Sequence, residues 1–151
     1  MASARPSASS RNGRVTEAAS SLFLLDTSAL FALIEDEPGA DRVEALLRGE
    51  AVLIPAVAGL EVYYVTCQER GEDEADRRLS LIRQLPARWL DQFDERVLIA
   101  AGRLKARISL ADAIIAGFAS TAGAILVHKD PEYEAIAAEV QQERLPYEPR
   151  T

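Results

Sequence analysis

The chain has 151 residues, of which 48% are hydrophobic, so a single domain can bury a core without disulfides or structural metals. One cysteine and one histidine, Cys67 and His128, exclude an internal disulfide and a Cys/His zinc site, and they favour a reducing cytoplasm. The net charge of −7 is a poor electrostatic match for nucleic acid unless the surplus acids surround metal ions or face a basic partner.

The first 20 residues are rich in Ser, Ala and Arg and carry a net charge of +2, which leaves −9 on the rest. They lack the apolar core of a secretory signal and faintly resemble a mitochondrial transit peptide, although an upstream start codon explains them equally well. We interpret residues 1–20 as a disordered extension and residues 21–148 as one folded domain. No apolar run is suited to spanning a membrane, since the nearest, residues 51–68, contains Pro55 and Glu61.

Short apolar runs alternate with amphipathic segments along the rest of the chain. In chain order the pattern predicts a strand at 21–26, helices at 27–35 and 40–48, a strand at 51–54, helices at 55–70 and 72–85, a short strand at 88–91, helices at 93–107 and 110–122, a strand at 124–127, a short helix from 131 and an edge strand near 145–147. Apolar strands separated by helices predict an α/β fold with a parallel sheet covered on both faces. In such sheets the functional site lies at the carboxyl ends of the strands.

Four acids lie where the surrounding sequence is otherwise uncharged. Asp26 ends the first predicted strand, Glu61 and Asp112 lie in apolar helices, and Asp130 follows the last buried strand. A buried carboxylate costs several kcal/mol unless it is paired, and the apolar segments around the first three contain no Lys or Arg. A shared Mg²⁺ or Mn²⁺ would satisfy these acids, because both ions prefer carboxylate oxygens and water.

Three of the acids also have a structural explanation as helix caps. Asp26 could cap the helix that begins at Thr27, Asp112 could form a capping box with Ser109, and Asp130 could cap a helix. Glu61 has the weakest alternative, which is a half-exposed surface glutamate. Caps are far commoner than metal ligands, so the case for a metal site depends on all four acids together.

The segments around the acids resemble the PIN domain, and most closely the VapC-type toxins of toxin–antitoxin pairs. The resemblance covers about residues 23–147 and rests on LLDTSALFALI, PAVAGLEVYYV and ISLADAIIAGFASTAGAILVHKDPEY. It implies a Rossmann-like three-layer α/β/α fold and an endoribonuclease activity that depends on Mg²⁺ or Mn²⁺. The chain departs from the family pattern at Gly59, where a larger or polar residue is more usual, and at Glu132-Tyr133, where Asp-Phe is frequent.

By position, the four family acids are matched by Asp26, Glu61, Asp112 and Asp130. The resemblance implies that Asp26 and Asp112 bind the first metal, that Glu61 completes that side, and that Asp130 orients a water or assists a second ion. Ser28, or alternatively Thr27, matches the hydroxyl that holds a carboxylate or a water by a hydrogen bond. Attack of water on the phosphorus would leave 5′-phosphate and 3′-hydroxyl ends.

The surfaces that would contact substrate are less specific. The exposed-looking cations near the acids are Arg103, Lys105, Arg107 and Lys129, which could contact RNA, although cations at a helix end also complement its dipole. We expect His128 at the rim of the site rather than as the general base. The aromatic residues Tyr63, Tyr64 and Trp89 are expected in the core or in an interface.

The resemblance also implies three partners, which are an RNA substrate, a cognate antitoxin that covers the site, and a second copy in a homodimer. The candidate docking surfaces are the helix at 55–67 and the stripe of Leu79, Ile82 and Leu85. Ordinary core packing explains the same apolar residues. No membrane partner is expected.

Other functions fit the acids less well. A haloacid dehalogenase-type phosphatase needs a second Asp where Ser28 stands, and a receiver domain leaves Glu61 unexplained despite the superficial match of Lys129. DNA nucleases of the flap-endonuclease kind are longer and carry more acids. The remaining alternative is a PIN-like module that binds RNA or protein without catalysis, and metal-dependent cleavage lost on single Asp substitution would separate the two.

Overall fold

The computed structural model describes residues 21–146, so the predicted extension at 1–20 and the chain from Tyr147 on lie outside the described residues. Within residues 21–146 the helices and strands follow the predicted order. No helix of this part of the chain has the length and apolar character needed to cross a bilayer.

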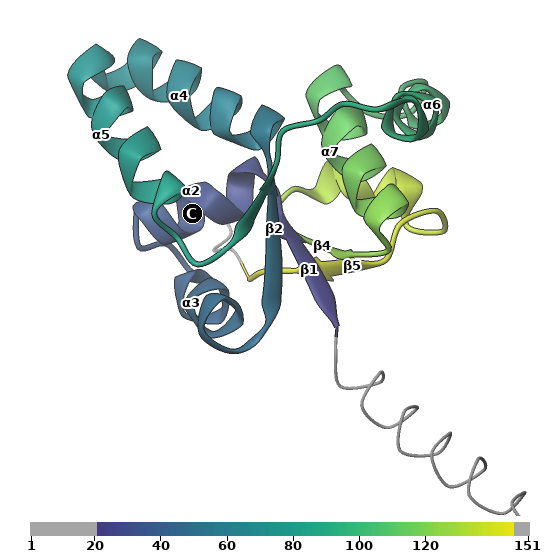
Figure 1. Ribbon diagram of the computed structural model, residues 1–151, viewed down its shortest axis with the longest axis horizontal. Helices are drawn as coiled ribbons and strands as arrows, with labels where there is room; N and C mark the ends of the chain where they lie inside the picture. Colours follow the sequence, from purple (N-terminus) through teal and green to yellow (C-terminus); the bar gives the residue numbers. More distant parts are fainter. Residues whose placement is uncertain (1–20, 147–151) are drawn as a thin grey trace, which may run out of the picture.

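A parallel sheet of five strands forms the middle layer of the fold (Figure 1). Its order is β3-β2-β1-β4-β5, with the bounds β1 Leu22–Leu25, β2 Ala51–Pro55, β3 Arg88–Leu90, β4 Ile125–His128 and β5 Gln142–Arg144. β1 pairs with both β2 and β4, so Leu24 lies between Leu53 and Leu126. The inner strands are almost wholly apolar because helices cover both faces of the sheet.

Helices form a layer on each side of the sheet, which confirms the predicted three-layer α/β/α fold (Figure 1). One layer contains α2 (Thr27–Ile34), α3 (Ala40–Gly49), α4 (Ala56–Arg70) and α5 (Glu72–Arg83), and the other contains α6 (Glu95–Leu104) and α7 (Leu110–Ala122). The chain runs outward from β1 to β3 along the first layer and returns through the second layer to β4, beside β1. The connections that follow β1 and β4 therefore leave toward opposite faces of the sheet.

Three predicted boundaries are wrong by a few residues. Pro55 ends β2 rather than beginning a helix, because its ψ of 143° is extended. α6 begins only after Asp94, whose side chain accepts a backbone N–H of the first turn over 3.0 Å. β5 precedes the predicted edge strand near 145–147, and Leu145 is buried in the core. Because β5 is an edge strand of polar residues, it has no apolar alternation from which its position could be predicted.

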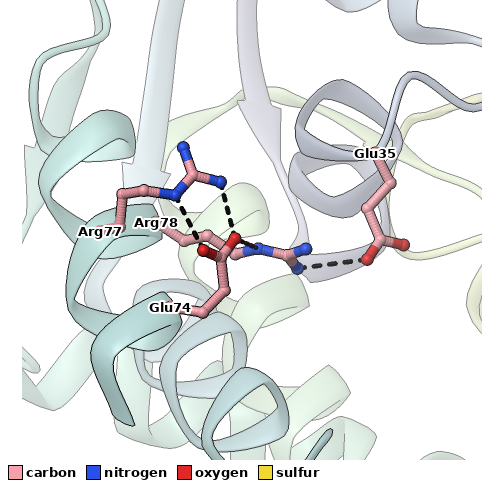
Figure 2. Close-up of polar contacts among 4 residues, drawn as sticks. All are labelled: Glu35, Glu74, Arg77 and Arg78. Carbon is pink, nitrogen blue, oxygen red and sulfur yellow. Dashed lines mark hydrogen bonds and ion pairs between the residues drawn. The ribbon is translucent and has the colours of Figure 1, made fainter. Parts of the chain in front are cut away.

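A buried arginine holds α5 against the end of α2 (Figure 2). The side chain of Arg78 is 5% exposed, and its Nη1 lies 3.2 Å from Oε2 of Glu35, which caps the carboxyl end of α2. Its Nε donates to Glu74 over 2.9 Å, and the more exposed Arg77 contacts the same carboxylate. α2 has no basic residue in its own last turn, so Arg78 supplies the positive charge that favours this helix end.

Candidate metal centre

The carboxyl ends of β1 and β4 lie side by side at the edge of the sheet where the two connections diverge. The backbone N–H of Asp26 donates to Val127 O over 3.1 Å, so Asp26 continues the pairing just beyond β1. Asp130 follows the end of β4 by two residues. Open α/β sheets bind their ligands at such a switch in strand order, because the diverging connections leave a crevice.

Asp26 is almost fully buried, with 2% of its surface exposed. Its Oδ1 accepts the backbone N–H of Ala29 over 2.9 Å, so it caps α2, and it accepts the hydroxyl of Ser28 over 2.7 Å. Oγ of Ser28 in turn accepts the backbone N–H of Lys129 over 2.9 Å. Ser28 therefore ties Asp26 to the end of β4, as the expected hydrogen bond to a carboxylate requires.

Glu61 reaches the same region from α4. Its Oε1 accepts the hydroxyl of Thr27 over 2.5 Å, and its side chain is half-buried. The two hydroxyls that follow Asp26 thus support different acids, Thr27 supporting Glu61 and Ser28 supporting Asp26. The sequence analysis predicted that only one of these two hydroxyls, Ser28 or alternatively Thr27, would support the site.

The tightest group of carboxylates contains a residue that the sequence did not predict as a ligand. Single oxygens of Asp112, Asp130 and Glu132 lie within 4.8 Å of one another. Ser109 caps α7 through the N–H of Asp112, and Asp130 caps the 3₁₀-helix η1 (Pro131–Ile136) through the N–H of Glu132 over 2.9 Å. The family frequently has Asp at the position of Glu132, and this second acid after Asp130 was the sequence feature from which a ligand could have been predicted.

The acids also act on one another electrostatically. Burial, with smaller contributions from the charges of Asp112 and Asp130, raises the pKa of Asp26 to about 7. Burial, together with those same two charges, raises the pKa of Glu61, and burial raises that of Asp112. All four predicted acids therefore share one electronegative site, although Asp26 and Glu61 lie outside the tightest group.

No basic side chain within residues 21–146 forms an ion pair with any of the four acids. Lys129 is adjacent to Asp130 in sequence, but its Nζ lies 3.3 Å from Glu37 instead. A divalent cation would offset the repulsion among the acids, and an all-oxygen ligand set suits Mg²⁺ or Mn²⁺. The residues at this site therefore fit such an ion.

The expected position of His128 at the rim of the site is wrong, because the side chain is buried with 1% exposed. Its Nδ1 accepts the N–H of Asp130 over 3.0 Å, and its Nε2 lies 2.8 Å from Oε1 of Gln142. Burial lowers the pKa of His128, so the ring is neutral near pH 7. No sequence pattern pointed to Gln142, because a single Gln on an edge strand is ordinary.

Tyr133 is a second residue of the site that the sequence did not assign a role. It is fully buried, its ring lies 4.6 Å from that of His128, and its hydroxyl donates to Oδ1 of Asp112 over 3.2 Å. The departure from Phe at this position was the only available signal. The hydroxyl that Tyr adds is the atom that contacts the acid.

The other predicted surface residues divide between packing and exposure. Arg103, Lys105 and Arg107 are all exposed, and Arg107 also binds Ala135 O and Glu139. Ile82 is buried in the core, so the docking stripe that contained it is wrong and core packing explains it. The large apolar residues that α4 leaves exposed are Leu60 and Tyr64, at 60% and 44%.

The aromatic residues Tyr63 and Trp89 do not form an exposed stacking surface. Trp89 is half-buried beneath the guanidinium of Arg83, which lies 4.5 Å from the ring centroid. Tyr63 donates its hydroxyl to Asp76 over 2.7 Å. Both therefore serve packing between α4, α5 and β3 in this part of the chain.

Comparison with known proteins agrees with this geometry. The sequence profile of the PIN domain matches residues 23–139, which is most of the chain. The chain belongs to the PIN domain family. Because the chain is a PIN domain, its acids are not those of a haloacid dehalogenase-type phosphatase or of a receiver domain. Curated protein sequences give no match to this PIN domain.

Solved structures of VapBC complexes have the same fold. VapBC2 from Rickettsia felis, bound to a DNA fragment from its promoter, gives a TM-score of 0.69 at 18% identity over 83% of this chain and 99% of that chain. VapBC-1 from nontypeable Haemophilus influenzae gives 0.65 at 21% identity, over 82% and 97%. VapBC-5 from Mycobacterium tuberculosis, a member of the VapBC family of toxin–antitoxin systems, gives 0.59 at 17% identity, over 83% and 98%.

Proposed function

We propose that this PIN domain is a metal-dependent endoribonuclease that hydrolyses RNA phosphodiester bonds. The observation that carries the proposal is the gathering of buried and half-buried acids at one edge of the sheet without a basic partner among residues 21–146. Placing these charges together costs free energy that ordinary core packing does not require. A divalent ion shared by the acids gives a physical reason for the arrangement.

The ligand set that we propose for Mg²⁺ or Mn²⁺ consists of Asp26, Glu61, Asp112 and Asp130, with Glu132 added from the geometry of the site. When bound, the ion would lower the pKa of a water molecule and stabilise negative charge on the phosphoryl oxygens. Ser28 holds Asp26 and Thr27 holds Glu61, so each of these acids has one oxygen oriented by a hydroxyl. Attack of a water oxygen on phosphorus, with departure of the 3′ oxygen and its protonation, would leave 5′-phosphate and 3′-hydroxyl ends.

The role that we propose for the nuclease is that of the toxin in a toxin–antitoxin pair in the cytoplasm. The fold likeness to VapBC proteins and the membership of the PIN family support this role. A cognate antitoxin would then cover the acids, and a homodimer would use apolar surface such as Leu60 and Tyr64 on α4. The exposed cations Arg103 and Lys105, just before the Asp112 helix, are the candidate RNA contacts.

Cleavage of a panel of single-stranded RNAs by the purified full chain tests the activity. We expect cleavage with Mn²⁺ or Mg²⁺, none with EDTA, and none with Asp26→Asn or Asp112→Asn. Asp41→Asn is the matched control, because Asp41 is an exposed acid of α3 outside the site. Cleavage that persists in EDTA, or in both site variants, would overturn the proposed metal-dependent mechanism.

Calorimetry with Mn²⁺ separates the nuclease from a non-catalytic binding module. A nuclease with a narrow RNA preference would still bind Mn²⁺ in the wild type and bind it much more weakly after Asp26→Asn. A module without a metal site would bind RNA or protein equally well in EDTA. The toxin role has its own test, which is growth arrest on expression in bacteria that a small neighbouring gene product relieves.

A further inference from the structure

Three buried or partly buried side chains outside the proposed ligand set connect Asp112 and Asp130, two of the three acids in the tightest carboxylate group. Nδ1 of His128 accepts the backbone N–H of Asp130, and its Nε2 lies 2.8 Å from Oε1 of Gln142. Nε2 of Gln142 donates to the backbone carbonyl of Tyr133 over 2.8 Å. The hydroxyl of Tyr133 then reaches Oδ1 of Asp112.

The proton positions in this network follow from its donors and acceptors. A backbone N–H can only donate, so Nδ1 of His128 must present a lone pair to Asp130. The neutral ring then carries its proton on Nε2 and donates it to the amide oxygen of Gln142, whose NH₂ group faces the carbonyl of Tyr133. Burial raises the pKa of Tyr133, so its hydroxyl remains a donor.

We propose that His128, Gln142 and Tyr133 are positioning residues that hold Asp112 and Asp130 in place for a shared ligand. The inference rests on the proposed function, because it takes these two acids to be metal ligands. Asp112 lies in the first turn of α7 and Asp130 caps η1, so the two acids belong to different elements, and they repel each other when both are ionised. The network joins them by hydrogen bonds through His128, Gln142 and Tyr133, and the backbone N–H of Tyr133 also donates to the carbonyl of Asp130 over 3.3 Å.

Burial makes this network stiff. Tyr133 and His128 are 0% and 1% exposed, and their rings pack against each other at an interplanar angle of 51°. A polar group in such a place keeps its hydrogen bonds, because an unmade bond leaves an uncompensated donor or acceptor in the core. Gln142 extends the network to β5, so an edge strand that holds no acid of the site helps to orient two of them.

A positioning role requires the polar atoms of these side chains, whereas ordinary core packing requires only their shape. Gln142→Met keeps the length of the side chain and removes both hydrogen bonds, and Tyr133→Phe keeps the ring and removes only the hydroxyl. The matched controls are Gln84→Met and Tyr63→Phe, since Gln84 caps the end of α5 and bonds Ser80, and Tyr63 bonds the exposed Asp76. Each control removes the same polar atoms as its site variant, but from a side chain outside the network.

The test combines nuclear magnetic resonance with metal titration of the untagged full chain. His128 is the only histidine, so the ¹⁵N shifts of one imidazole report the tautomer without ambiguity. We expect the Nε2–H tautomer in the wild type and a mixture of tautomers in Gln142→Met. We also expect each site variant to bind Mn²⁺ roughly tenfold more weakly, with kcat reduced more than KM changes, and both controls to match the wild type.

Two results would overturn the inference and are distinguishable from failure of the proposed function. A wild-type proton on Nδ1 would show that the network does not exist as described. Unchanged Mn²⁺ affinity in Gln142→Met and Tyr133→Phe, with a wild type that binds Mn²⁺, would reduce the three residues to packing. Absence of Mn²⁺ and Mg²⁺ binding by a wild type with the Nε2–H tautomer would instead refute the metal site itself, and with it the positioning role.

Discussion

The hydroxyl of Thr27 donates a hydrogen bond to Oε1 of Glu61 and so joins the first turn of α2 to α4. Glu61 caps no helix, so this bond is its main support from the protein. The bond lowers the pKa of Glu61 against the effect of burial, which raises it. Thr27 therefore favours the ionised form of Glu61 and also orients its side chain.

Thr27→Val removes this donor and keeps the shape of the side chain. We expect weaker Mn²⁺ binding and a pH profile of cleavage shifted to higher pH, because Glu61 then binds its proton more tightly. Thr66→Val is the control: its Oγ1 is buried without a partner among residues 21–146, so stability should stay the same or rise by about 1 kcal/mol. An unshifted profile in Thr27→Val would show that the hydroxyl does not tune Glu61.

Asp26 makes the stability of the metal-free protein depend on pH. Its pKa is about 7 in the folded protein against an ordinary 3.8, so folding takes up a proton between these values. The contribution of Asp26 to the free energy of unfolding therefore rises as pH falls from 8 to 5, by about 2–3 kcal/mol. Urea unfolding in EDTA should show this rise in the wild type relative to Asp26→Asn, in which His128 is still present. Parallel curves for the two proteins would refute the raised pKa.

Saturating Mn²⁺ should reverse this dependence. The metal needs ionised ligands, so protons compete with it below about pH 7. We expect Mn²⁺ to raise the melting temperature of the wild type more at pH 8 than at pH 5.5, and EDTA to remove the effect at both. Asp41→Asn should behave like the wild type. An equal rise at both pH values would indicate that the ion binds elsewhere.

Gly59 allows the indole of Trp89 to pack against α4 two residues before Glu61. A Cβ at Gly59 would lie 2.8 Å from Cζ3 and 2.9 Å from Cη2 of Trp89, whose ring also contacts the guanidinium of Arg83. We expect Gly59→Ala to lower the free energy of unfolding by about 1–3 kcal/mol. Gly102→Ala in α6, where a Cβ meets nothing within 4 Å, should raise it by about 0.5–1 kcal/mol. Equal effects in the two variants would refute the close approach of Trp89.

Arg78 should be more important to stability than its neighbour Arg77. Arg78→Met leaves Glu35 and Glu74 without their buried partner, and we expect a loss of about 1–3 kcal/mol in urea unfolding. Arg77 is 59% exposed, so Arg77→Met should have little effect. A loss of similar size in both variants would show that the ion pair to Glu35 is not what holds α5 to α2.

The sequence by itself determined the elements and the four acids that begin or interrupt them. Apolar runs such as Leu22–Leu25 predict buried strands wherever helices cover both faces, and the strand order then follows from few choices. Asp26, Glu61, Asp112 and Asp130 stood out because each is a charge in an apolar segment. These are local signals, so one sequence was enough to find them.

Only the tertiary structure decided how the site is held together. Ser28 binds the backbone of Lys129 across 101 positions of the chain, and Gln142 meets His128 across 14. The tertiary structure also buries His128, pairs Lys129 with Glu37 and places Glu132 beside Asp112. No local pattern encodes such contacts, because each depends on where the parallel sheet places the ends of strands that are distant in sequence.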